Sequence, residues 1–188
     1  RSSGRETLGR VMAGAIAKKL LKEREKTEVF GHTIQVGNIK AETFTKSIIE
    51  KNELRCADKK AAKEMQKLIE QTRFKEGDSI GCIIEIMIKN PPKGLGHPVF
   101  DKLDADLAKA MMSIGAVKGI EIGSGFGAAS KKGSENNDQM ISKNKSAKFL
   151  SNNAGGILGG ISTGEDIIIR LAIKPVPSIS KELQTVTN

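Results

Sequence analysis

Residues 79–89, SIGCIIEIMIK, carry the strongest strand signal of the chain. Successive side chains of a strand point to opposite faces of its sheet, so alternating residues share one face. In this stretch the odd-numbered positions mix small, apolar and charged residues, whereas the even-numbered ones are all apolar: Ile80, Cys82, Ile84, Ile86 and Ile88. The alternation predicts a strand with one wholly apolar face, around which the rest of the chain can be organised.

Two segments upstream of this strand have signals of their own. Residues 29–39 alternate well enough for a strand that Gly31 and Gly37 interrupt. A helix is then predicted after Asp58, whose carboxylate can cap it, and before Gly77. One face of this helix holds Ala62, Met65, Leu68 and Ile69.

Downstream of the strand, a loop rich in Pro and Gly precedes a predicted helix over residues 100–113 and a strand over 116–123. Residues 124–151 are rich in Ser, Asn, Lys and Gly, which predicts a polar insertion, either a functional flap or a mobile loop. A hairpin follows, with a turn at Ser162, Thr163 and Gly164 and a returning strand over residues 167–174.

The fold class follows from this order of elements. Strands outnumber helices and do not alternate regularly with them, which favours an α+β fold in which helices pack on largely antiparallel β-sheet. We predict a single domain over residues 1–188.

The chain opens with RSSGRETLGRVMAGAIAKKLL, in which apolar residues recur at helical spacing and are predicted to pack inward. This stripe consists of Leu8, Val11, Met12, Ala15, Ile16 and Leu20. Ser3 and Glu6 have the spacing of a capping box, so the helix is expected to begin at Ser3. A helix N-terminus flanked by Arg1, Ser2 and Arg5 suits a phosphate or carboxylate, although a plain cap with solvated arginines explains the same residues.

Composition narrows the class of protein. Of the 188 residues, 38% are apolar, and 31 basic against 22 acidic residues give a formal net charge of +9. The basic charge favours an anionic partner. Six Phe are the chain's only aromatic residues, which argues against a surface for stacking nucleic-acid bases, and a phosphorylated small molecule fits at least as well. The sequence shows neither a membrane-spanning run nor a signal peptide, so the expected location is the cytoplasm.

Several motifs allow two interpretations. SNNAGGILGGISTGED places Gly155, Gly156, Gly159 and Gly160 in a strand-like segment, which fits close approach of a ligand ring or a bend in the backbone. KPVPS, at residues 174–178, is either a rigid exit that presents backbone groups or a plain strand terminator. Asp101, Asp104 and Asp106 could act as acid or base, but Asp101 and Asp104 fit helix caps better.

The cysteines and histidines show no site pattern. Cys56 and Cys82 lie outside any CxxC motif and are interpreted as reduced thiols. His32 and His97 have no companion at metal-ligand or triad spacing, so each is interpreted as structural or solvated. No metal site is predicted.

Four blocks of the chain resemble the chorismate synthase family, in the family's order. They are RSSGRETLGRVMAGAIAKK, GLGHPVFDKLDADLAKAMMSIGAVKGIEIGSGF, SNNAGGILGGISTGEDI and KPVPSI, and they span almost the whole chain. The chain departs from the family at Gly4 and Gly115, where most members have Ala and Asn. The resemblance implies a β-α-β sandwich, of which this chain is the central portion. It also implies a lyase of the shikimate pathway that uses reduced FMN, without net redox change, to eliminate phosphate from 5-enolpyruvylshikimate 3-phosphate and give chorismate.

The resemblance also implies which residues form the site. Arg5 would bind the anionic substrate. The flavin contacts would fall on Arg1, Ser2, Ser3, Gly115, Ala116, Gly159, Lys174, Pro175, Val176, Pro177 and Ser178. Family members are longer, and the parts absent here carry the histidines and the acidic group implicated in catalysis. We therefore assign no catalytic residue to this chain and expect it to be inactive by itself.

The resemblance further implies a homotetramer. Some family members reduce the flavin themselves with NADPH-type cofactors, and others depend on a separate flavin reductase. The competing hypothesis is a basic, non-enzymatic module that binds nucleic acid or an anionic partner, and the polar segment at 124–151 is its best support.

Overall fold

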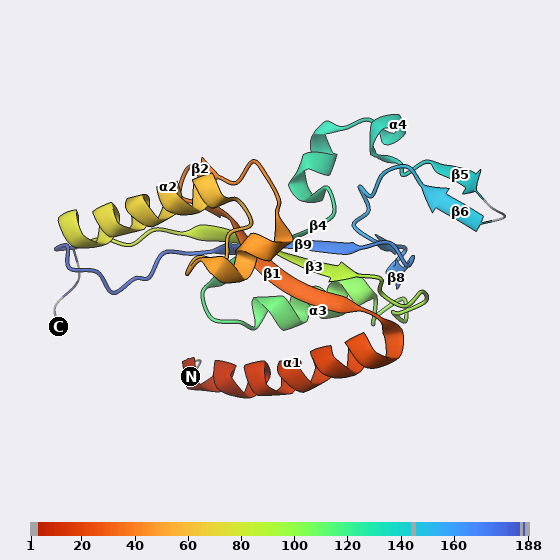
Figure 1. The fold of residues 1–188 in the computed structure, drawn as a ribbon, viewed down its shortest axis with the longest axis horizontal. Coiled ribbons are helices and arrows are strands. Elements are labelled where there is room, and N and C mark those ends of the chain that lie inside the picture. The colour runs from red at the N-terminus through yellow and green to blue at the C-terminus, as the bar shows by residue number, and fades with distance from the viewer. Residues whose placement is uncertain (1–3, 144–145, 185, 187–188) are drawn as a thin grey trace. The chain divides into compact units, whose positions relative to one another are not determined.

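The computed structural model describes residues 4–143, 146–184 and 186 (Figure 1). In chain order its elements are α1 (Gly4–Glu25), β1 (Glu28–Val36), β2 (Ile39–Lys40), η1 (Lys46–Lys51), α2 (Lys59–Glu70), η2 (Gln71–Lys75), β3 (Cys82–Lys89), α3 (Leu103–Met112), β4 (Val117–Ile122), η3 (Gly125–Ser130), α4 (Gly133–Asn136), β5 (Met140–Lys143), β6 (Ser146–Phe149), β7 (Ile157–Leu158), β8 (Ile161–Ser162) and β9 (Ile167–Ile173). The predicted strand at 79–89 is thus β3, shorter by three residues at its start.

Five strands form the main sheet, in the order β2-β1-β3-β9-β4. Three hairpins, β1–β2, β5–β6 and β7–β8, are antiparallel. With helices beside the sheet (Figure 1), the structure confirms the α+β class.

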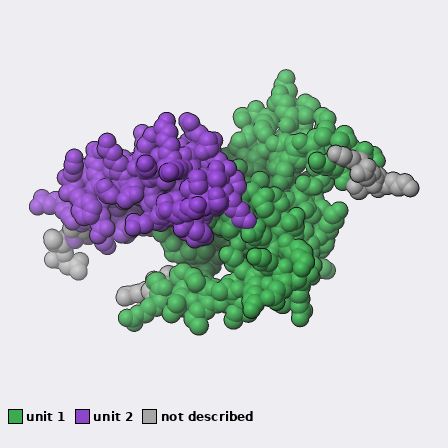
Figure 2. Space-filling model, in the orientation of Figure 1, with its two compact units in different colours: residues 1–31, 85–171 green, residues 32–84, 172–188 purple. Residues whose placement is uncertain are grey.

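The chain divides into two compact units, drawn in separate colours in Figure 2. Unit 1 comprises residues 1–31 and 85–171, and unit 2 comprises residues 32–84 and 172–188. Strands β1, β3 and β9 contribute residues to both units. Each unit is described by itself, and the single domain predicted from the sequence stays a prediction.

The core of unit 2 forms around α2, and its start is the one that the sequence predicts. The carboxylate of Asp58 accepts hydrogen bonds from the N–H groups of Lys60 (2.9 Å) and Ala61 (3.0 Å), which satisfies two donors of the first turn. The helix then buries Ala61, Ala62 and Met65 against Val36 and Cys56. The predicted cap and the predicted position of Met65 on an apolar face are both confirmed.

The core of unit 1 comes mainly from its strands, since Val117, Ile157, Ile167, Ile169 and Leu171 are buried. Helix α1 adds no buried residue between Gly4 and Glu25. The predicted inward packing of its stripe is therefore wrong: the exposed fraction of the large apolar side chains runs from 47% at Leu20 to 74% at Ile16. The helical period showed which residues share a face, but among the residues that the structure describes nothing buries that face.

The single strand predicted at 29–39 is wrong in one respect. The chain turns at Gly37, where φ is +54°, and residues 39–40 return as β2. Gly37 is suited to this turn because a left-handed backbone strains residues that carry a Cβ.

Two other boundaries differ from the predictions. The helix predicted from residue 100 begins at Leu103, because paired backbone hydrogen bonds between His97 and Asp101 hold the preceding residues in a tight bridge. The turn predicted at Ser162, Thr163 and Gly164 is also misplaced. The hairpin instead turns at Gly159 and Gly160, both with positive φ, and the strand that follows, β9, joins the main sheet.

The polar segment at 124–151 contains η3, α4 and the β5–β6 hairpin. Its described residues therefore include short regular elements. The notion that the segment acts as a flap stays a prediction.

Candidate functional site

The start of α1 lies beside the end of α3 in unit 1 (Figure 1). Arg10 joins the two helices, since its guanidinium donates a 2.6 Å hydrogen bond to Ser113 Oγ. Ser113 Oγ in turn donates to the carbonyl of Ala110 in the last turn of α3. A cation at this position is favourable, because the C-terminal end of a helix carries negative partial charge.

Arg5 lies on the first described turns of α1 and its side chain is exposed. A helix rises 1.5 Å per residue, so Arg5 is about 7 Å along the axis from Arg10. The cationic start of α1 is thus close to the segment that follows Ser113. Arg1, Ser2 and Ser3, and with them the predicted cap at Ser3, lie outside the described residues.

Gly115 and Ala116 form the turn between α3 and β4. Ala116 has a φ of +71°, a left-handed conformation that costs an alanine about 1 kcal/mol. Such strain persists only where the surroundings impose it, and it recurs at ligand sites. A Cβ placed on Gly115 would meet open space. The asparagine that most family members have here would therefore fit without a clash at its Cβ.

The glycine-rich segment is explained largely by the protein's own packing. A Cβ on Gly155 would collide with the backbone of Gly123, one on Gly156 with backbone atoms of Glu165 and Asp166, and one on Gly160 with the side chain of Lys102. Of the two interpretations, the bend in the backbone accounts for these three glycines. Gly159 differs, since its surroundings are open and only its φ of +58° favours glycine.

Two residues that the sequence analysis missed hold this segment. The carboxylate of Asp138 accepts hydrogen bonds from the N–H groups of Asn153 (2.7 Å) and Ala154 (2.8 Å) and from Ser151 Oγ (2.6 Å). Burial by itself would raise the pKa of Asp138, but these hydrogen bonds outweigh it and hold the pKa below its ordinary value.

The second missed residue is Asn152. Its amide nitrogen donates to the carbonyl of Asp166 (2.7 Å), and its amide oxygen accepts from the N–H of Gly156 (2.7 Å). The Asn- and Gly-rich composition around Asn152 was a sequence signal for this backbone-holding role. Asp138 gave no such signal, because its partner Asn153 lies 15 residues away along the chain. Together Asn152 and Asp138 fix the backbone that leads to Gly159.

Residues 174–178 belong to unit 2, where they leave the end of β9. Ser79 Oγ donates a 2.7 Å hydrogen bond to the carbonyl of Val176. Farther along, Lys181 pairs with Asp78 at 2.8 Å, which lowers the pKa of that carboxyl. The segment after β9 therefore lies along residues 77–81, while the side chain of Val176 stays exposed.

The predicted site residues thus divide between the units. Arg5, Gly115, Ala116 and Gly159 are in unit 1, and residues 174–178 are in unit 2. The convergence of these two groups on one ligand stays a prediction.

The remaining candidates take structural roles. Asp104 Oδ1 accepts from the N–H of Ala105 in the first turn of α3, as an acidic residue at a helix start is expected to do. Asp101 bonds His97 through the backbone, and Lys102, not Asp101, occupies the N-cap position. His32 is buried with its ring 5.1 Å from that of Phe44, and His97 is exposed.

Within the described residues, no three His, Cys, Asp or Glu side chains gather as metal ligands would. In the same part of the chain, none of the helices has both the length and the apolar character needed to cross a membrane.

Comparison with known proteins shows which family the chain belongs to. The family model described as chorismate synthase matches residues 1–188. The chorismate synthase of Methanosarcina mazei is 54% identical over 190 residues, which cover 99% of this chain and 52% of that protein. The chorismate synthase of Gloeothece citriformis is 52% identical over 192 residues, which cover all of this chain and 53% of that protein.

A solved structure of a chorismate synthase superposes with a TM-score of 0.86 at 34% identity, covering 94% of this chain and 57% of the other. The chain spans about half the length of the curated relatives it matches. The resemblance first seen in four sequence blocks extends to the whole chain and to its fold. The chain belongs to the chorismate synthase family.

Proposed function

We propose that the full-length protein that carries this chain is a lyase that eliminates phosphate from 5-enolpyruvylshikimate 3-phosphate to form chorismate. The observation that supports this most directly is in unit 1. The cationic start of α1 and the strained turn at Gly115 and Ala116 belong to different family motifs, yet the contact between Arg10 and Ser113 holds them close together.

In this proposal Arg5 binds an anionic group of the substrate. Its guanidinium presents several N–H donors, and the positive end of the α1 dipole adds to their attraction for phosphate or carboxylate oxygen. Fixed donors of this kind need no reorganisation as charge develops on the leaving phosphate. Arg5 thus binds and orients; no proton transfer is assigned to it.

The residues present fit a flavin as the further ligand. Gly159 has open space beside it, Gly115 likewise, and Ala116 holds a conformation that its own side chain disfavours. We propose that these three residues, with Arg1, Ser2, Ser3 and residues 174–178, hold reduced FMN. When bound, the reduced flavin supplies electron density to the reacting substrate. Asp138 and Asn152 keep the backbone around Gly159 in place for this contact.

The proposal extends to the setting of the reaction. We propose a homotetramer in the cytoplasm, supplied with reduced flavin by a separate reductase or by its own use of a nicotinamide cofactor. Because this chain contains no assigned acid or base, we expect residues 1–188 by themselves to show no turnover.

The test is Arg5→Ala in the full-length protein. Loss of one charge-assisted contact should lower kcat/KM about 10- to 100-fold, while Arg5→Lys should retain part of the activity. The matched control is Lys18→Ala, which removes an exposed cation about three and a half turns farther along the same helix. Thermal unfolding should be the same for all three variants.

Two outcomes would contradict the proposal. One is equal activity of Arg5→Ala and Lys18→Ala. The other is salt-sensitive binding to any polyanion together with indifference of FMN binding to the phosphorylated substrate, which is the behaviour of a basic binding module.

A further inference from the structure

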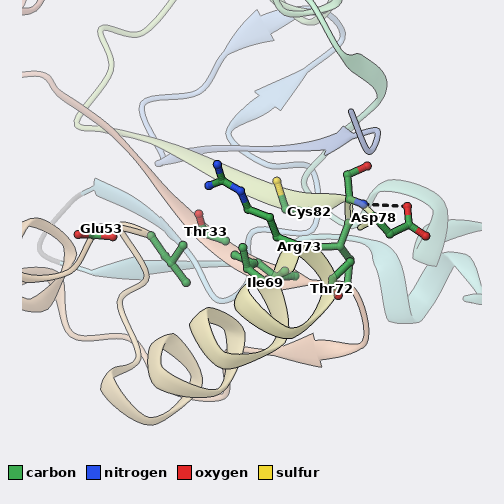
Figure 3. Close-up of a pocket in the computed structure, with 11 residues that line it drawn as sticks. Thr33, Glu53, Ile69, Thr72, Arg73, Asp78 and Cys82 are labelled. Carbon is green, nitrogen blue, oxygen red and sulfur yellow. Dashed lines mark hydrogen bonds between the residues drawn. The ribbon is translucent and has the colours of Figure 1, made fainter. Parts of the chain in front are cut away.

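Unit 2 contains a cavity of about 400 Å³ that the proposed lyase function does not use (Figure 3). It lies among β1, the loop after η1, the end of α2 and the start of β3. Its lining consists of Thr33, Val36, Glu53, Leu54, Ile69, Thr72, Arg73, Asp78, Ser79, Ile80 and Cys82. None of these residues belongs to the motifs assigned above to flavin or substrate, and the volume is within the range of small-molecule sites.

The floor of the cavity is apolar. Val36 is buried in the same cluster as Met65, and Ile69, Ile80 and Leu54 pack against that cluster from outside it. Each of these three side chains is half-buried, so part of its apolar surface is open to the cavity. An apolar ligand body that covers this surface would remove it from water, which is favourable in proportion to the area covered.

Arg73 provides the cation of the cavity. It lies on η2, the π-helical turn that continues α2, and Figure 3 shows its guanidinium extending past Thr33 and Cys82. Its guanidinium carbon lies 5.2 Å from the centre of the Phe74 ring. None of the ion pairs between described residues involves Arg73, so within this part of the chain no carboxylate competes with a ligand for its donors.

The two acidic residues of the lining determine how much negative charge a ligand can carry. Asp78 is already neutralised by Lys181 at 2.8 Å, and it also accepts from the N–H of Ser79. Glu53 is exposed and adds negative charge to the rim. One unneutralised cation beside one exposed carboxylate suits a ligand of a single negative charge better than a dianion such as phosphate.

We propose that this cavity binds a small monocarboxylate with an apolar, ring-sized body. The carboxylate would accept hydrogen bonds from the Arg73 guanidinium, whose planar fork matches its two oxygens. The apolar body would lie against Val36, Ile69 and Ile80. The cavity contains none of the residues assigned to flavin or substrate, although Ser79 of its lining donates a hydrogen bond to the carbonyl of Val176 in the flavin segment. The test therefore measures binding and not turnover.

The test uses the full-length protein and 3-phenylpropanoate as the probe, with 3-phenylpropanamide and phenyl phosphate as comparisons. Calorimetric titration should show one saturable site for the carboxylate and weaker binding of both comparisons. Arg73→Gln should weaken binding of the carboxylate about 10-fold or more and leave the affinity for the neutral amide unchanged. Lys67→Gln, an exposed cation on α2 outside the lining, is the matched control and should change neither.

A second measurement locates the probe. Cys82 lines the cavity, whereas Cys56 is fully buried, so alkylation of Cys82 by iodoacetamide reports on access to the cavity. Saturating 3-phenylpropanoate should slow alkylation of Cys82 several-fold in the parent protein and have less effect in Arg73→Gln.

Each of three results would overturn the proposal: no saturable binding of the carboxylate at millimolar concentration, equal effects of Arg73→Gln and Lys67→Gln, or binding that leaves alkylation of Cys82 unchanged. Arg73→Gln and Lys67→Gln are compared by ligand binding in folded protein, so a failure of the lyase assay would not affect this result.

Discussion

Helix α2 places three of its 12 residues in the core of unit 2, whereas α1 buries none of its 22. Both helices show apolar residues at helical spacing. They differ in what surrounds that pattern: α2 begins at a carboxylate cap and packs beside Val36 and Cys56, while α1 contains the internal glycines Gly9 and Gly14 and exposes its stripe. A helical repeat therefore identifies a shared face, but burial depends on what the rest of the chain provides.

The length of the family relatives gives this difference a meaning. The chain covers about half of each of the relatives described. An apolar stripe as long as that of α1 is costly to expose to water, so we expect further polypeptide to cover it in the full-length protein. The contrast between α1 and α2 can be tested by substitutions in each helix.

The largest effect is expected for Met65→Ala in α2. Met65 is fully buried, and removing most of its side chain should leave a cavity in the cluster around Cys56. We expect a loss of about 3 kcal/mol in the free energy of unfolding. Denaturant unfolding measures it, and a loss below about 1 kcal/mol would mean that the cluster can close around the smaller side chain.

Asp58→Ala should have the next largest effect. Besides capping α2, Asp58 accepts from the N–H groups of Glu42 (3.1 Å) and Thr43 (3.0 Å), so four backbone donors depend on it. We expect the free energy of unfolding to fall by about 2 kcal/mol. The amides of Lys60 and Ala61 should be among the first to lose hydrogen-exchange protection. Unchanged protection there would contradict the capping role.

The same carboxylate predicts a dependence on pH. The hydrogen bond from Ala61, followed by those from Thr43 and Glu42, holds the pKa of Asp58 far below its ordinary value. A carboxyl with a lowered folded-state pKa contributes stability above its unfolded pKa of about 4, and this contribution is lost as the pH falls below it. The parent protein should therefore lose stability between about pH 5 and pH 2 more steeply than Asp58→Ala. Parallel curves of unfolding free energy against pH would exclude this role.

A smaller effect is expected where α1 meets α3. Arg10→Ala removes an exposed hydrogen bond to Ser113, which should lower the free energy of unfolding by about 0.5 kcal/mol. Hydrogen exchange in the first turns of α1 should become faster, and exchange in α2 should not. Equal changes in both helices would show that the contact has a wider role than holding the start of α1.

Ile16→Ala should have the smallest effect in the 188-residue chain. Because 74% of the side chain is exposed, we expect a change within about 0.5 kcal/mol. In the full-length protein the same substitution should cost about 2 kcal/mol, as expected for a buried isoleucine. Equal small costs in both forms would show that the stripe stays exposed.

Sequence reasoning succeeded where the determining interaction is local. The cap at Asp58 lies two and three residues from the N–H groups it binds, and the alternation in β3 depends only on neighbours. It failed for the β7–β8 hairpin, where Ser162, Thr163 and Gly164 have turn-forming composition, but the antiparallel register places the turn at Gly159 and Gly160.

The candidate site shows the same limit. Family motifs identified Arg5, Ala116 and Gly159 as residues of interest, but the groups that position them were not predictable. The contact between Arg10 and Ser113 spans 103 residues, and Asp138 reaches the N–H of Ala154 across 16. Such pairings depend on the path of the backbone in three dimensions, on which local patterns carry no information.

Strands β1, β3 and β9 each continue across a border between the two units, at 31/32, 84/85 and 171/172. Borders between independently folding domains usually fall in exposed linkers. Here a genetic cut at any of these borders would divide a strand of the main sheet and leave unpaired backbone groups on both products. Attempts to express either unit as a separate protein should therefore yield aggregation-prone material.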